Sequence, residues 1–185
     1  MNENGKDEDQ SNIRNKLFGH TGLVIIGSAD IIGNAISATF WLIVASLLSV
    51  KEYGEISYFV AIASLGICCV VGSPQALTVY STRHQKIIPT LLLLTLIFTV
   101  IGSLIAFLIV QRFEIITLIF SFIVLDVSLT LLLGKKLYSK YSKFLITQKI
   151  LQFIIGIGLS FSLGVNGVLI GIALANFSLI PIFYK

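Results

Sequence analysis

Three ionisable side chains stand inside long apolar stretches of this chain: Asp30, Asp126 and Lys149. An ionised side chain near the centre of a bilayer costs roughly 2.5 to 3.5 kcal/mol on insertion scales, so something must offset that cost. Counted from the expected cytoplasmic ends of their helices at about 1.5 Å per residue, the three groups lie at depths that agree within roughly 5 Å. We therefore take them as the candidate functional groups, gathered in one layer.

Polar neighbours extend this layer, because the Ser37 hydroxyl and several amide side chains recur beside the three groups at helical spacing. The candidate cavity residues are Asp30, Asn34, Asp126, Lys149, Gln148 and Gln152. Asp126 and Lys149 lie on consecutive antiparallel helices and could form a pair. A polar layer of this kind is the expected lining of a hydrated cavity. The alternative is that Lys149 extends to the cytoplasmic surface along its own stem while the two aspartates are neutral and packed.

Six apolar segments must position these groups. A helix needs about 20 apolar residues to cross a bilayer, since its backbone polar groups must be satisfied without water. The polar residues 1–16 are expected to form a disordered cytoplasmic tail, and residues 17–185 a six-helix transmembrane domain. The expected helices span residues 22–50, 56–80, 87–110, 115–133, 144–163 and 165–184.

Composition supports the same fold class, an all-α integral membrane protein. Of 185 residues 56% are hydrophobic and 12% charged, with a mean hydropathy of +0.96, whereas average soluble chains carry roughly 25% charged residues. The net charge of +4 reflects topology rather than a nucleic-acid partner. Ten Lys and Arg residues fall on one side of the expected helices and two, Lys51 and Arg112, on the other. Cytoplasmic loops hold the excess, so both termini are expected in the cytoplasm.

Small residues and prolines mark expected packing and bending positions. Gly167, Gly171 and Ala175 recur every four residues, which would let neighbouring helices approach closely. Gly72 and Pro74 would loosen the second helix, either as a kink whose freed carbonyl is satisfied by neighbours or as a hinge.

Several motifs, taken in order, resemble polysaccharide-biosynthesis membrane proteins of the O-antigen flippase type. The first helix closes on residues 47–54, Leu-Leu-Ser-Val-Lys-Glu-Tyr-Gly, and the second contains Gly72 followed by Arg83. A basic loop, residues 134–143, follows the fourth helix, and residues 164–171, Gly-Val-Asn-Gly-Val-Leu-Ile-Gly, resemble the family's glycine-rich entry to its sixth helix. The resemblance covers about residues 18 to 184.

This resemblance implies a carrier of the multidrug/oligosaccharidyl-lipid/polysaccharide exporter superfamily, which moves lipid-linked saccharides across the cytoplasmic membrane by alternating access. Some relatives use acidic residues of the first helix to couple transport to H+ or Na+, and Asp30 is the position that could match. No other cofactor is implied. Cavity arginines, which such flippases use for pyrophosphate, are not evident within the expected helices, where Lys149 is the only base.

Such carriers have two six-helix lobes, so this chain resembles one lobe. Two parallel copies could mimic both lobes as a homodimer, or a partner could supply the second lobe. Other readings stay open: a non-transporting membrane subunit or truncated remnant of a glycan-assembly system, and a cation-coupled small-molecule antiporter of the same superfamily. An enzyme is not expected, because the sequence has no phosphate-cradling glycine loop, metal cluster or nucleophile motif. The two aspartates within the expected helices, Asp30 and Asp126, also lack the motifs of intramembrane aspartyl proteases.

Overall fold

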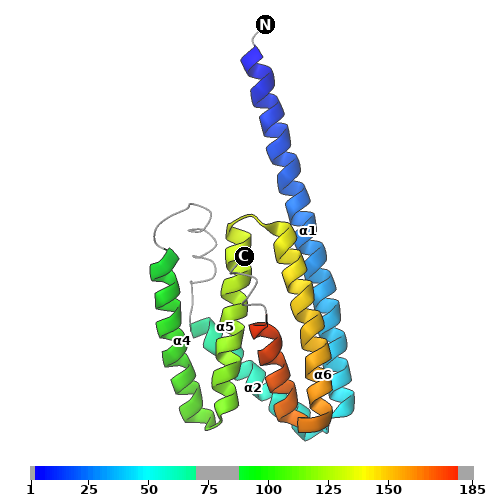
Figure 1. Cartoon of the computed structure of the whole chain (residues 1–185), viewed down its shortest axis with the longest axis vertical. Coiled ribbons are helices and arrows are strands. Elements are labelled where there is room, and N and C mark those ends of the chain that lie inside the picture. The colour runs from blue at the N-terminus through cyan, green and yellow to red at the C-terminus, as the bar shows by residue number, and fades with distance from the viewer. Residues whose placement is uncertain (1–2, 70–87, 179–185) are drawn as a thin grey trace.

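The computed structural model describes residues 3–69 and 88–178, with side chains described for residues 22–65 and 88–178. Within these ranges every regular element is a helix (Figure 1). The elements are α1 (Glu3–Leu47), α2 (Val50–Cys69), α4 (Ile88–Val110), α5 (Phe113–Gly134) and α6 (Tyr138–Phe177).

Helix α1 begins at Glu3, so the polar N-terminal residues are continuous with the first apolar helix. No proline interrupts residues 3–47. Extending an existing helix fixes one residue for each new hydrogen bond and is far easier than nucleating one. The apolar part of α1 therefore supplies the nucleus from which its polar extension can grow.

A reciprocal cap at Ser49 and Glu52 makes the turn between α1 and α2. The Ser49 backbone N–H and hydroxyl both donate to Glu52 Oε2, at 2.9 and 2.7 Å, and the Glu52 N–H donates to Ser49 Oγ at 3.3 Å. This is a capping box, which satisfies donors that a helix start leaves free. These hydrogen bonds lower the pKa of the Glu52 carboxyl, and the Ser49 hydroxyl contributes more to this shift than the Ser49 backbone N–H. Helix α2 therefore begins at Val50 rather than at residue 56.

The turn between α4 and α5 is tied to α2 by Arg112. Its guanidinium lies 3.0 Å from Glu55 Oε1 and 5.4 Å from the centre of the Phe59 ring. This is the one ion pair found among the described residues. The α1–α2 turn, the α4–α5 turn and the reversal of α6 thus lie at the same end of the bundle, the lower end in Figure 1.

Helix α6 contains both of the last two expected helices and reverses direction at Gly164. That residue has φ +56° and ψ −129°, a conformation essentially restricted to glycine. Residues 138–163 form the first arm of α6 and residues 165–177 the second. The sequence predicted six separate helices, whereas the described residues form five, because a single reversing residue joins two of them without a loop.

Glycines hold the two arms of α6 together. A Cβ added to Gly171 would lie 2.6 Å from the Cα of Gly156, and one added to Gly167 would meet the Leu159 carbonyl. Backbones approach this closely only where side chains are absent. The four-residue ladder of small residues noted in the sequence therefore lies along the contact between the arms.

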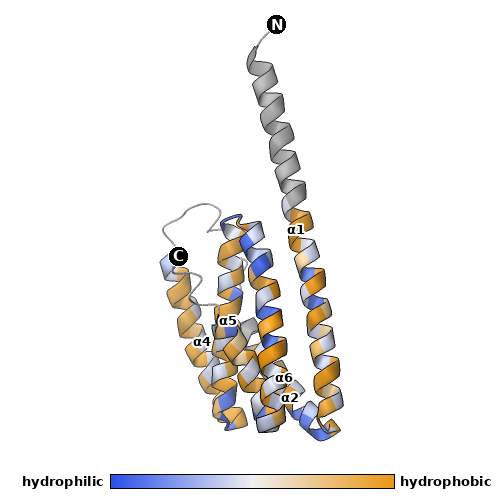
Figure 2. Cartoon of the chain, turned by 45° about the vertical axis from the view of Figure 1, so that its right-hand side comes forward, coloured by the Kyte–Doolittle hydropathy of each residue, from blue (hydrophilic) through white to orange (hydrophobic). Residues whose placement is uncertain are grey.

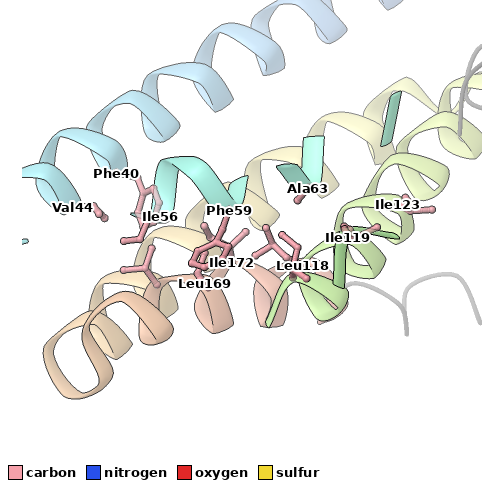
Figure 3. Close-up of a cluster of buried hydrophobic side chains, with 13 residues drawn as sticks. Phe40, Val44, Ile56, Phe59, Ala63, Leu118, Ile119, Ile123, Leu169 and Ile172 are labelled. Atoms are coloured by element: carbon pink, nitrogen blue, oxygen red, sulfur yellow. The ribbon is translucent and has the colours of Figure 1, made fainter. Parts of the chain in front are cut away.

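Helix α6 lies between α1 and α5, and α4 packs on the other side of α5. Helix α2 runs across the lower half of the bundle and contacts α5, α4 and α6. The lower core, centred on Phe40, Phe59 and Ile172, joins α1, α2, α5 and both arms of α6 near the reversal (Figure 3). The upper core lies near the α5–α6 turn and contains Ala29, Leu132, Tyr141, Phe144 and Leu145.

The outward faces of the bundle are apolar as well. Hydrophobic residues recur along α4, α5, α6 and the part of α1 from residue 22 onward (Figure 2). Large hydrophobic side chains such as Leu108 and Ile109 on α4 are about 70% exposed. Four described helices are long and apolar enough to cross a membrane: Gly22–Leu47, Ile88–Val110, Phe113–Gly134 and Tyr138–Phe177. Hydrocarbon is the environment in which such surfaces are stable.

Replacing Gly164 with alanine should destabilise the fold, because an L-residue at φ +56° carries a strain of about 1–3 kcal/mol. Gly158→Ala is the matched control, since Gly158 lies in the first arm of α6 with open space around its Cα; there alanine should be neutral or stabilising by up to about 1 kcal/mol. Thermal unfolding of both variants in one detergent measures the difference. Equal melting temperatures would contradict the assigned reversal.

Candidate functional site

A hydrogen bond between α1 and α6 anchors the candidate site. Tyr141 Oη donates to Asp30 Oδ1 at 3.1 Å. Close packing of the two helices makes this contact possible: a Cβ on Gly22 would lie 2.7 Å from the Tyr138 ring, and one on Gly33 would touch Leu145. Asp30 is half-buried and Tyr141 is buried. The phenol thus offers the carboxyl group a donor inside an apolar bundle, which offsets part of its desolvation.

Asp126 approaches the same tyrosine from α5. It is half-buried, and Tyr141 lies within electrostatic range of both Asp126 and Asp30. Acidic side chains of two different helices, α1 and α5, therefore lie within electrostatic range of one buried phenol.

Lys149 is placed differently. Its stem packs against α1, with Cγ 3.7 Å from a Cβ position on Gly33, and it forms no ion pair with Asp126 in the described part of the chain. It lies two helical turns beyond Tyr141 along α6. Asn34, one turn beyond Asp30, is exposed.

A second polar cluster, the amide network, lies deeper in the bundle. Gln148 Nε2 donates to Gln152 Oε1 at 3.2 Å and to Asn176 Oδ1 at 2.7 Å, while Asn176 Nδ2 donates to Ser121 Oγ at 3.2 Å. These four residues, from α5 and both arms of α6, are all buried. Satisfied side-chain hydrogen bonds between helices stabilise membrane bundles modestly, by about 0.6 kcal/mol each.

Proton accounting fixes the direction of this network. Ser121 donates its own proton to the Leu118 carbonyl at 2.8 Å, so its oxygen must accept from the Asn176 amide nitrogen. The Asn176 side-chain oxygen therefore faces Gln148, and Gln148 must donate to it from its amide nitrogen. Gln148 Oε1 is consequently left without a donor, although the residue is only 1% exposed. A buried acceptor without a partner costs about 1–3 kcal/mol.

Ser37 carries a second buried oxygen without a partner in the described structure. On α1 it lies between Gly33, which packs on Leu145, and Phe40, which packs on Gly156. Ser37 is therefore level with the amide network across the α1–α6 contact.

A hollow with a mainly apolar lining lies elsewhere. A groove of about 370 Å³ runs between α4 and α5. Its few hydroxyl groups include Thr95 and Thr99, which donate to carbonyls of their own helix. The groove therefore offers hydrocarbon rather than ionic surface, and its size alone does not make it the functional centre.

Sequence reasoning missed Tyr141, Ser121 and Asn176. Tyr141 was assigned to the basic loop before the fifth helix, but α6 begins earlier, at Tyr138. Asn176 had a detectable signal: Gln148 and Asn176 lie sixteen and twelve residues from Gly164, so a helical hairpin that reverses there brings them to within about one turn of the same level. Gly72 and Pro74 lie outside the described residues, and Gly167 and Gly171 face the first arm of α6.

The fold and its polar interior define an all-helical membrane protein. In comparisons with family models, curated proteins and solved structures, the chain matches none. The resemblance seen in the sequence therefore enters the functional assignment as a proposal.

Tyr141→Phe should lower the free energy of unfolding by about 0.6–1.5 kcal/mol, because Asp30 loses its phenolic donor. The control is Tyr138→Phe, which removes a hydroxyl that has no partner among the described residues and keeps the ring against Gly22. Reversible unfolding in mixed micelles measures both. Equal losses would argue against the Asp30–Tyr141 bond.

Asn176→Leu should cost about 1–3 kcal/mol, since Gln148 Nε2 and Ser121 Oγ each lose a partner while the number and branching of side-chain heavy atoms stay the same. Ser37→Ala removes a hydroxyl that has no protein partner and should change stability by less than about 0.5 kcal/mol. The same unfolding assay compares them. A larger loss for Ser37→Ala would show that the amide network is wrongly assigned.

Proposed function

We propose that this chain is one lobe of a membrane carrier that translocates lipid-linked oligosaccharide or polysaccharide precursors across the cytoplasmic membrane. In this proposal the chain crosses the bilayer six times with both termini in the cytoplasm. The arms of α6 supply the fifth and sixth crossings. Three described turns at one end of the bundle and the α5–α6 turn at the other end support this arrangement.

The observation that carries the proposal is that Asp30 is bonded to Tyr141 and that Asp126, from another helix, lies within electrostatic range of the same tyrosine. Carboxyl groups are expensive in an apolar bundle, and those found there commonly serve proton or ion pathways. Asp30 belongs to α1, which packs chiefly against α6. Binding of H+ or Na+ at this pair would change the electrostatic attraction between α1, α5 and α6. A carrier needs such a link between ion binding and helix position.

The substrate class comes from the resemblance of the turn at residues 47–54 and of the glycine-rich residues 164–171 to O-antigen flippases. Lipid-linked saccharides carry phosphate groups, and a cation within the span could attract them. Lys149 is the intramembrane candidate, half-buried beside α1. Coupling to H+ or Na+ belongs to the same proposal, with Asp30 as the first candidate.

A second lobe completes the carrier. Even-numbered crossings return the chain to its starting side, so two copies are parallel and can form a twofold dimer, while a separate partner could supply the same lobe. The apolar outer faces of α1 and α4 can be covered either by lipid or by this second lobe.

A non-transporting subunit of a glycan-assembly system is the second candidate. The amide network favours it, because Gln148, Asn176 and Ser121 direct their hydrogen bonds at one another rather than at an open cavity. In that case the polar interior serves helix assembly alone.

Flipping of a fluorescent lipid-linked saccharide by proteoliposomes distinguishes these functions. Asp30→Asn and Asp126→Asn should each reduce transport at least tenfold while inserting normally, because the ion-binding pair is lost. Glu114→Gln makes the same charge change at the other end of α5 and should leave transport intact.

Full activity in both aspartate variants would remove the pair from the mechanism. If the wild type, alone or with a second-lobe partner, moves no substrate, the subunit function is favoured instead.

A further inference from the structure

We propose that an anionic phospholipid of the bilayer binds along the seam between α1 and α6, with its phosphate at the α5–α6 turn. The headgroup cleft, as we define it, has a volume of about 360 Å³ and is lined by Gly22 and Ile25 of α1 together with residues 136–140. This inference does not depend on the transport proposal.

Charge makes the cleft suitable for a phosphate. Lys136 and Lys140 both line it, no acidic residue does, and neither lysine forms an ion pair in the described part of the structure. Lys136 has φ +56°, so the turn is sharp and keeps both lysines close to the start of α6. Basic pockets at the cytoplasmic ends of membrane helices attract anionic headgroups.

Hydrogen-bond donors add to this charge. Ser139 supplies a hydroxyl at the cleft, and the first turn of α6 begins without a side-chain cap at Leu137. Its free backbone N–H groups favour negative charge. Ionic and hydrogen-bonding groups therefore converge at one end of the seam.

The seam continues as a hydrocarbon surface. A second hollow of about 360 Å³, here called the tail hollow, is lined by Ala35, Ile36, Thr39, Ile150 and Phe153. On α1, Ile25, Ile32, Ile36 and Thr39 follow each other at steps of seven, four and three residues, so they form one stripe. The hollows thus lie on the same side of α1, with Ile32 47% exposed between them.

The length of this stripe fits a lipid in one leaflet. Ile25 and Thr39 are fourteen residues apart, about 21 Å of helix. Half of a hydrocarbon core of about 30 Å is about 15 Å, to which the headgroup region is added. A free phosphate would use only the cleft, whereas a phospholipid uses both hollows. The continuous apolar stripe therefore favours the phospholipid.

Native mass spectrometry of the purified full-length protein tests the proposal, with phosphatidylglycerol and phosphatidylcholine offered at equal concentration. We expect phosphatidylglycerol to be preferred, and Lys136→Ala/Lys140→Ala to reduce that preference by about tenfold or more. Lys135→Ala/Lys143→Ala is the matched control. It removes two exposed lysines of the same segment that do not line the cleft, and it should retain the preference.

The tail hollow has its own test. Ala35→Phe should fill the tail hollow and weaken phosphatidylglycerol binding, whereas Ala45→Phe, on an exposed part of α1 outside it, should not. Circular dichroism confirms that each variant is folded.

Three outcomes would overturn the proposal. Equal losses in the two double-lysine variants would show unspecific surface charge. Displacement of the lipid by soluble glycerol phosphate would show a phosphate site without a tail site. Stronger binding of a polyprenyl diphosphate than of phosphatidylglycerol would assign the seam to a lipid-linked substrate instead.

Discussion

The close contact between the two arms of α6 is the constraint on which the rest of the bundle depends. Gly156 and Gly171 meet backbone to backbone, and Gly156 also receives the edge of the Phe40 ring. This one level of the structure therefore joins both arms of α6 to α1. Because lipid is as apolar as the helix surfaces, such steric fit has to supply much of the association energy that water exclusion supplies in soluble proteins.

The buried amide network has an apolar core on each side of it along the length of the bundle. The amide network lies between the lower core around Phe59 and the upper core around Phe144. Hydrogen bonds give direction and register, which hydrocarbon contacts lack, whereas each unsatisfied atom costs stability. The orphan oxygen of Gln148 shows that this arrangement specifies a geometry without reaching the lowest possible energy.

Much of the fold could be predicted from the sequence, since uninterrupted apolar runs locate α4 and α5 to within two residues at each end. The boundary between the last two expected helices was predicted at residue 164, yet the single-residue reversal there depends on backbone angles that a sequence does not display. Asp30 and Asp126 were identified by their cost in a bilayer. Tyr141 was not identified, because a tyrosine in a lysine-rich stretch resembles a residue of the membrane interface. It lies within the helical bundle only because α6 begins as early as Tyr138.

The hydrogen bond between Asp30 and Tyr141 spans 111 residues of sequence, which has a consequence for biosynthesis. At about 5–20 residues per second, translation separates the emergence of the two partners by on the order of ten seconds. During that interval the first helix must enter the membrane with its carboxyl group unaccompanied by the phenol. The bond can therefore stabilise the bundle only after α6 has been synthesised. A ribosome stalled before α6 would leave Asp30 on α1 without its hydrogen-bond partner.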